Sequence, residues 1–230
     1  YATLNIINDV SKNVITIEDP VEYKLKGINQ ISVNPKAGLT FASSLRAILR
    51  ADPDIVLIGE IRDRETAMIA VESALTGHLV LSSLHTNDAA SAITRLVEME
   101  VETFLVASAI DCVVAQRLAR KLCEKCKSAY APDTVELAAA GYPEEVFPEI
   151  KELFHPVGCS ACAKTGYRGR IGLFEVMPIT EEIERMTIEH QSSTRVSSFA
   201  VTQGMVPLRQ DGLAKVKAGV TSIELRPWRR

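Results

Sequence analysis

The segment DPDIVLIGEIRD, residues 52–63, decides the fold. At its centre is an apolar run, Ile55–Ile58, in which three of the four residues are β-branched. No polar residue alternates with them, so the run is predicted to be a strand buried on both faces, as strands of parallel sheets are. Gly59 follows the strand, and the acidic residue Glu60 comes directly after it.

Predicted strands and helices alternate on both sides of this segment. Runs of apolar and β-branched residues predict strands at 13–17, 30–33, 54–58, 78–82 and 113–118. Helical spacing of apolar residues predicts helices at 1–10, 40–51, 64–75, 89–98 and 103–110. Thr40 is a candidate N-cap, and Gly77 follows the end of a helix. The alternation indicates an α/β fold with a mainly parallel sheet, covered by helices on both faces.

The chain is predicted to divide into three parts. Residues 1–119 form the α/β core. Residues 120–176 hold four paired cysteines and many prolines and glycines, which suits a small insert stapled by a metal. From Thr180 the pattern is helical again, so residues 177–230 are predicted to form a C-terminal helical subdomain.

Composition is that of an ordinary globular protein. The net charge is −3 and the calculated isoelectric point is about 5.9, which provides no electrostatic footprint for nucleic acid. No apolar run approaches the roughly 18 residues of a membrane span, and no basic stretch followed by an apolar core marks a signal peptide. A cytoplasmic location is expected.

Four of the five cysteines form two C-x-x-C pairs, Cys123 with Cys126 and Cys159 with Cys162, separated by 32 residues. Each pair can aim two thiolates at one ion, and two pairs complete a closed tetrahedral zinc site that serves structure rather than catalysis. Redox dithiols and free buried cysteines are the alternatives. The fifth cysteine, Cys112, is expected to be a small buried hydrophobe.

Three segments place polar side chains at the ends of predicted strands. The first, residues 17–22, delivers Glu18, Asp19 and Glu22, and the second delivers Glu60. In α/β sheets, ligands bind at the carboxyl ends of the strands. An apolar strand ending in an acid is the layout of a Walker B element, in which a carboxylate holds the Mg²⁺ shell or polarises water.

The third segment, residues 77–87, places a histidine at each end of one strand. His85 lies at the carboxyl end, where it could contact a γ-phosphate, whereas His78 lies near the other end and suits coupling or packing. Each segment also has a structural interpretation: a solvated turn, an N-cap or a packed histidine. Polar residues at the ends of three successive apolar strands together favour a functional site over these structural interpretations. A G-x-x-x-x-G-K-[ST] loop is absent from the 230 residues.

In this order, the three segments resemble the Asp box, the atypical Walker B and the His box of the type II/type IV secretion superfamily of hexameric motor ATPases. The tetracysteine insert narrows the resemblance to the type II secretion and type IV pilus assembly members. Residues 162–175 and 205–222 also follow the family pattern, whereas 226–230 departs from it. The resemblance implies a RecA-like core, and it implies a Walker A loop directly before Tyr1. The chain is therefore expected to be a C-terminal fragment that hydrolyses little ATP alone.

The resemblance also implies roles for individual residues. Glu60 and Glu18 or Glu22 would be the catalytic acids, ordering Mg²⁺ and activating water, and His85 would report the γ-phosphate. The resemblance places Asp19, Arg62 and His78 in nucleotide and Mg²⁺ binding. An Arg62–Asp63 salt bridge is expected to serve coupling. The implied cofactors are structural Zn²⁺, and Mg²⁺ with ATP in the full-length protein.

The implied assembly is a cytoplasmic homohexamer that joins the inner membrane peripherally, through a platform protein, and drives pilin or pseudopilin assembly. No nucleic-acid partner is expected. Two other classes of function stay open: a non-catalytic docking module built on the zinc insert, and a zinc-ribbon nucleic-acid binder. The sequence leaves undecided which machine is served.

Overall fold

The computed structural model describes residues 1–224, so the atypical tail at 226–230 lies outside the described residues. Two compact units make up the chain. The first comprises Tyr1–Val113 and Pro178–Phe199, and the second comprises Val114–Met177 and the residues from Ala200 onward. The three-part division expected from the sequence stays a prediction.

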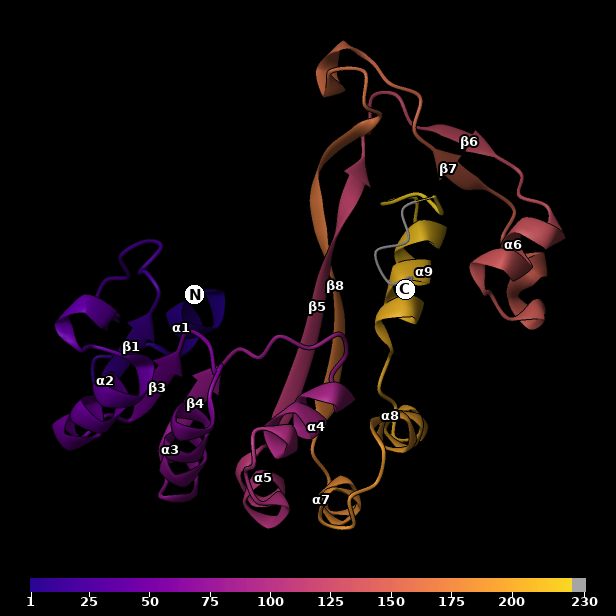
Figure 1. The fold of residues 1–230 in the computed structure, drawn as a ribbon. Helices are drawn as coiled ribbons and strands as arrows, with labels where there is room; N and C mark the ends of the chain where they lie inside the picture. The colour runs from indigo at the N-terminus through magenta and orange to yellow at the C-terminus, as the bar shows by residue number, and fades with distance from the viewer. Residues whose placement is uncertain (225–230) are drawn as a thin grey trace. The chain divides into compact units, whose positions relative to one another are not determined.

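A four-stranded parallel sheet forms the centre of the first unit (Figure 1). Its strand order is β2-β1-β3-β4, with β1 at Val14–Glu18, β2 at Asn29–Ser32, β3 at Ile55–Ile58 and β4 at Leu79–Ser82. The predicted parallel sheet is confirmed. Ile17 pairs with Ile31 on one side and with Ile58 on the other. Ile17, Val56 and Ile58 have no exposed surface, as expected for central parallel strands.

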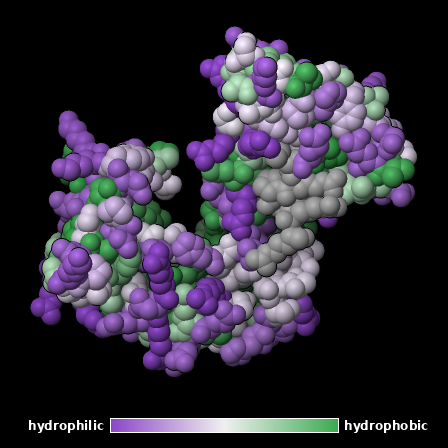
Figure 2. Space-filling view, turned by 45° about the horizontal axis from the view of Figure 1, so that its top comes forward, coloured by the Kyte–Doolittle hydropathy of each residue, from purple (hydrophilic) through white to green (hydrophobic). Residues whose placement is uncertain are grey.

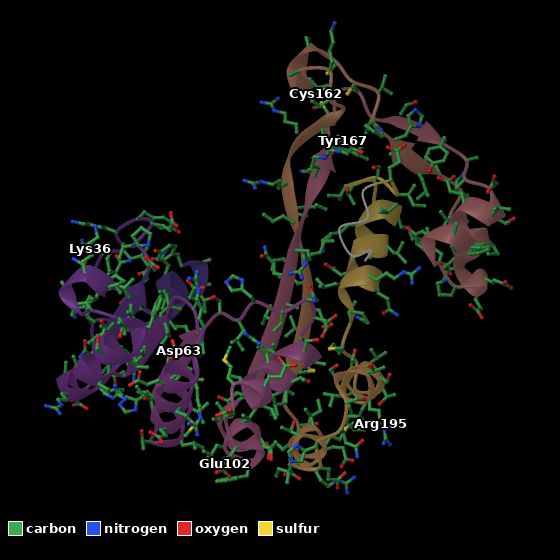
Figure 3. The ribbon with its side chains drawn as sticks, viewed as in Figure 1. Lys36, Asp63, Glu102, Cys162, Tyr167 and Arg195 are labelled. Carbon is green, nitrogen blue, oxygen red and sulfur yellow. The ribbon has the colours of Figure 1, made fainter. Side chains whose placement is uncertain are left out.

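Helices pack against this sheet, α2 beside β1 and α3 beside β4. Two of them begin at the side-chain caps that their sequences favour. Thr40 caps α2 in a reciprocal capping box with Ser43, and Asp63 caps α3 by accepting from the backbone N–H of Thr66 (Figure 3). The helices of this unit are α1 (Ala2–Ile7), α2 (Phe41–Ile48), α3 (Arg64–Leu75), α4 (Ala90–Glu98), α5 (Thr103–Ala109) and α7 (Glu181–Ile188).

Two predicted helices are too long. The helix expected over 1–10 ends at Ile7, and the helix expected over 40–51 ends at Ile48, where a 3-10 turn, Leu49–Ala51, replaces it. Asp52, which follows that turn, has a left-handed backbone with φ 49°. The chain must reverse there to enter β3, so apolar spacing alone overestimates the helix length.

The second unit is built on a ribbon of two long strands that run in opposite directions, β5 (Cys112–Leu122) and β8 (Tyr167–Pro178) (Figure 1). A small antiparallel pair, β6 (Ser128–Tyr130) and β7 (Leu153–His155), lies beside α6 (Thr134–Ala140) and α9 (Leu208–Lys217). Helix α8 (Ser193–Thr202) connects the two units in sequence.

The ribbon corrects two expectations. The strand expected over 113–118 is longer at both ends, and most of β8 lies in the expected insert, where the sequence predicts no strand. Burial alternates along β8 from Leu173 to Pro178, a period-two pattern in which the acidic residue Glu175 takes a buried position. Alternation also explains why Cys112 is exposed rather than buried, since it begins β5 on the outward-facing set of residues.

Each unit has its own core. In the second unit, the interior of the small pair and its helices is formed by Leu137, Ala140, Tyr142, Ile150, Leu153, Leu213, Val216 and Ile223. Hydrophilic residues cover most of the face seen in Figure 2, broken by smaller hydrophobic areas. Among the described residues, no helix is long and apolar enough to span a bilayer.

Shortening Ile17 to alanine tests whether the sheet is the core of the first unit. Because this side chain is fully buried between two strands, Ile17→Ala should lower the free energy of unfolding by about 2–5 kcal/mol. Ile6→Ala is the matched control, since Ile6 is 84% exposed and should change stability by less than about 0.5 kcal/mol. Denaturant titration measures both. Equal losses of stability in the two variants would contradict the conclusion that the sheet forms the core of the first unit.

Candidate functional site

The carboxyl ends of β1, β3 and β4 are joined by hydrogen bonds into one edge of the sheet. The backbone N–H of Gly59 donates to the carbonyl of Ile17 over 2.7 Å, and the hydroxyl of Ser83 donates to the carbonyl of Gly59 over 2.7 Å. A Cβ at Gly59 would lie 3.2 Å from the carbonyl oxygen of Ile17, so glycine permits this close approach. The polar residues after the strands therefore meet.

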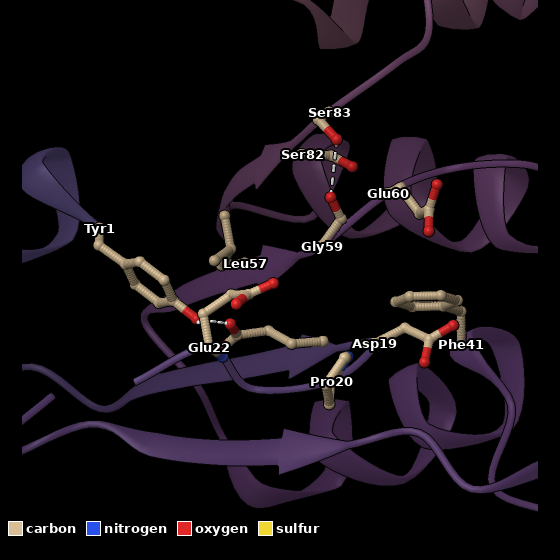
Figure 4. A pocket seen from close by; sticks show the side chains of 11 residues that line it. Tyr1, Asp19, Pro20, Glu22, Phe41, Leu57, Gly59, Glu60, Ser82 and Ser83 are labelled. Carbon is tan, nitrogen blue, oxygen red and sulfur yellow. Dashed lines mark hydrogen bonds between the residues drawn. The ribbon is translucent and has the colours of Figure 1, made fainter. Parts of the chain in front are cut away.

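A cavity of about 290 Å³ opens at this edge (Figure 4). It contains four carboxylate residues from two neighbouring strand ends, together with two serines from a third. The lining residues are Tyr1, Glu18, Asp19, Pro20, Glu22, Phe41, Leu57, Gly59, Glu60, Ser82 and Ser83. Clustered carboxylates and hydroxyls are the donor types that Mg²⁺ prefers.

Glu60 is a largely buried acid that contacts two basic side chains, Arg62 and His85. Its side chain is 14% exposed, and one oxygen, Oε2, accepts from Nε of Arg62 over 2.5 Å and lies 3.0 Å from Nε2 of His85. Burial by itself would raise the pKa of the carboxyl, but hydrogen bonds and charge from Arg62 and His85 together hold that pKa below its usual value of 4.5. Glu60 is therefore ionised at neutral pH.

Glu18 is held by neutral donors instead. It is 6% exposed and accepts hydrogen bonds from the hydroxyls of Tyr1 and Thr16 and from the side-chain amide of Gln30. Asp19 and Glu22, by contrast, are exposed at the cavity rim. Within residues 1–224, neither of their carboxylates forms a hydrogen bond or an ion pair.

The two histidines are separated as the sequence suggests. His85 follows β4 and reaches Glu60, although the imidazole is 81% exposed. His78 precedes the same strand, does not line the cavity, and lies with Nδ1 2.9 Å from the carbonyl oxygen of Ser73 at the end of α3. The structure thus groups Glu18, Asp19, Glu22, Glu60, Arg62 and His85, and it leaves His78 at the opposite edge.

The expected Arg62–Asp63 salt bridge is wrong. Arg62 bonds to Glu60, while Asp63 is occupied as the N-cap of α3, where both its oxygens accept from Thr66. Sequence reasoning also missed Tyr1, for which no motif gives a signal. Ser82 and Ser83 were within the quoted histidine segment, and their hydroxyls next to the strand end were the available signal.

The four paired cysteines converge in the second unit, where Cys162 ends the 3-10 turn Ser160–Cys162 that precedes β8 (Figure 3). All their Sγ atoms lie within 4.8 Å of one another. Three Sγ–Sγ separations are 3.9, 3.8 and 3.8 Å. Four sulfurs arranged tetrahedrally at zinc–sulfur distance would be about 3.8 Å apart. Backbone N–H groups of Gly158, Cys159 and Gly166 also donate to these sulfurs, which favours thiolates. The cluster fits zinc.

Comparison with known sequences decides the family. The sequence profile described as "Type II/IV secretion system protein" matches residues 1–226. The chain belongs to this family. The resemblance drawn from the three strand-end segments is thereby confirmed.

Two curated relatives illustrate the range of the family. "Type IV pilus assembly ATPase PilB" of Acinetobacter baylyi is 49% identical over 97% of this chain, which covers 39% of that protein. "Type II secretion system protein E" of Pseudomonas aeruginosa is 48% identical over 97% of this chain, which covers 44% of that protein. The chain thus spans about two fifths of the length of these relatives.

Solved structures agree on the fold. "Pilus Retraction Motor PilT and Bound ADP" superposes with a TM-score of 0.58 at 26% identity, over 93% of this chain and 55% of that one. The ATPase DotB of Legionella pneumophila superposes with a TM-score of 0.62 at 22% identity, over 94% and 50%. This chain therefore has the same α/β fold as these ATPases.

Titration tests the electrostatics of Glu60. Because the folded-state pKa lies below 4.5, ionised Glu60 stabilises the folded protein above pH 4.5, and that stabilisation is lost as pH falls through the lowered value. Unfolding free energies of the wild type and Glu60→Gln should therefore diverge above pH 4.5 and converge at lower pH. A constant difference across this range would contradict the assignment. Carboxyl NMR should show the Glu60 pKa rising in Arg62→Ala.

Proposed function

We propose that the full-length protein is a motor ATPase of a type II secretion or type IV pilus assembly system. The observation that carries the proposal is the shared cavity: the 18–22 turn and Glu60 face one space at the carboxyl edge of a parallel sheet. That is where α/β proteins bind their ligands. Family membership and ATPase relatives support the same reaction.

The side chains suggest a division of labour. Asp19 and Glu22 have unoccupied oxygens and would hold the water shell of Mg²⁺, which when bound would neutralise phosphate charge. Glu60 would orient the attacking water and accept its proton, with Arg62 and His85 fixing the carboxylate. His85, whose imidazole is 81% exposed beside Glu60, would sense the γ-phosphate.

Two further parts of the proposal concern the whole protein. The 230 residues contain no phosphate-binding loop, so turnover is proposed to require the longer polypeptide, and this chain alone should hydrolyse little ATP. We further propose a cytoplasmic homohexamer that binds an inner-membrane platform protein and couples hydrolysis to pilin or pseudopilin assembly. His78 is proposed for coupling, because it lies away from the cavity.

Zinc is proposed as a structural ion of the second unit. Cys123, Cys126, Cys159 and Cys162 would hold it in a closed site, so it would stabilise the fold and take no part in hydrolysis. The bound ion would stabilise the fold around the cysteines, where a large hydrophobic core would otherwise be needed.

Replacing the proposed base tests the reaction. In the full-length protein, Glu60→Gln should lower kcat for ATP hydrolysis at least about 100-fold, because the amide cannot accept the proton from water. Nucleotide affinity should change little. Glu72→Gln, an exposed change on α3, is the matched control and should retain full activity. Wild-type protein without ATPase activity, or a Glu60→Gln variant with near-normal kcat, would refute the proposal.

Elemental analysis tests the metal. The wild-type chain should contain about one zinc per molecule, and Cys126→Ser should lose most of it and lower the thermal midpoint. Cys112→Ser is the matched control, since this thiol is exposed and outside the cluster, and it should keep both zinc and stability. Purified wild-type protein with no metal and four titratable cluster thiols would exclude the zinc site.

A further inference from the structure

Tyr1 makes contacts that the proposed reaction does not explain. Its hydroxyl donates to Oε2 of Glu18 and accepts from the backbone N–H of Glu22 over 3.1 Å. Its ring packs against that of Tyr23, with the centroids 4.2 Å apart. One phenol therefore connects the first and last acids of the 18–22 turn at the wall of the cavity (Figure 4).

Glu18 has little capacity left for a ligand. Oε1 accepts from the hydroxyl of Thr16 over 2.5 Å and from the amide of Gln30 over 3.1 Å, while Oε2 accepts from Tyr1. A carboxylate has about four acceptor positions, and three of these are filled by donors from the protein. With 6% of its surface exposed, Glu18 is a fixed internal anchor.

Gln30 fastens the continuation of the turn. Besides Glu18, its amide donates to the carbonyl of Tyr23 over 3.2 Å, and its side-chain oxygen accepts from the backbone N–H of Leu25 over 2.6 Å. Tyr1 and Gln30 thus hold the backbone of residues 18–25 in place by hydrogen bonds to Glu22, Tyr23 and Leu25. Asp19 and Glu22 are exposed at the cavity, and within residues 1–224 their carboxylates form no hydrogen bond or ion pair.

We propose that Tyr1 is a positioning residue: its hydroxyl clamps Glu18 to the backbone of Glu22, so that Asp19 and Glu22, and not Glu18, face the bound metal nucleotide. The assignment rests on the proposed ATPase function for the identity of the ligand. It divides the two glutamates of the turn into an anchor, Glu18, and a ligand-facing group, Glu22.

The chemistry of the phenol suits this role. Burial and the hydrogen bond to Glu18 raise the pKa of Tyr1 above its usual value of 10.0. The hydroxyl therefore stays protonated at neutral pH and keeps donating to the carboxylate. Removing only that hydroxyl would free both ends of the turn without opening a cavity in the sheet.

Hydrogen exchange and kinetics on the full-length protein test the clamp together. Tyr1→Phe should speed exchange of the backbone amides of residues 19–25, and should lower kcat about tenfold with KM for ATP within about twofold, because a misplaced group slows chemistry more than binding. Tyr23→Phe is the matched control: it keeps the ring contact, and no hydrogen bond of its hydroxyl is observed in residues 1–224. It should change neither readout.

The glutamates separate the two roles. Glu18→Gln should reproduce the faster exchange of Tyr1→Phe, whereas Glu22→Gln should lower kcat and leave exchange unchanged. Tyr1→Phe should add little to the loss in kcat caused by Glu22→Gln, because it acts through that group.

Three results would overturn the proposal: unchanged exchange in Tyr1→Phe, additive losses in the double variant, or faster exchange in Glu22→Gln but not in Glu18→Gln. Absence of wild-type hydrolysis would instead refute the ATPase function. The exchange data would still decide whether Tyr1 clamps the turn.

Discussion

The parallel pairing of β1 with β3 is the constraint on which the site depends. Because the two strands run the same way and Ile17 lies opposite Ile58, both end at one edge, and the acids that follow them face the same cavity. The contact between Gly59 and the carbonyl of Ile17 carries this pairing one residue past the strand. A shift in register of one residue would move the end of β1 relative to the end of β3 by about 3.3 Å along the strand direction.

The acids at this edge are held by different kinds of partner. Glu60 depends on the positive charge of Arg62 and on His85, whereas Glu18 depends on neutral donors from Tyr1, Thr16 and Gln30. This difference matters because the side chains of Arg62 and His85 are exposed and their charge is screened by salt, while hydrogen bonds from neutral donors carry no net charge to be screened. The contacts of Glu60 should therefore be more sensitive to salt concentration than those of Glu18. The second unit has a separate source of order, the convergence of four thiols that fits a zinc ion.

Much of this could be predicted from sequence because strong local signals coincided. The apolar run Ile55–Ile58 forms the predicted strand, Thr40 caps the predicted helix, and the four paired cysteines converge as their spacing predicts. What failed depended on distant contacts. The exposure of Cys112 depends on which face of β5 is covered. The partner of Arg62 is Glu60 because Asp63 is used as a helix cap. Tyr1 forms its hydrogen bonds with residues 17 and 21 positions away in the sequence.

The central claim is that the edge formed by β1, β3 and β4 binds the metal nucleotide. A structure of the full-length protein with Mg²⁺ and a non-hydrolysable ATP analogue tests it most directly. The ion should lie in the cavity, separated by no more than one water from the carboxylates of Glu22 and Glu60. A nucleotide bound with its metal on another surface, leaving the 18–22 turn and Glu60 in contact with solvent alone, would contradict it.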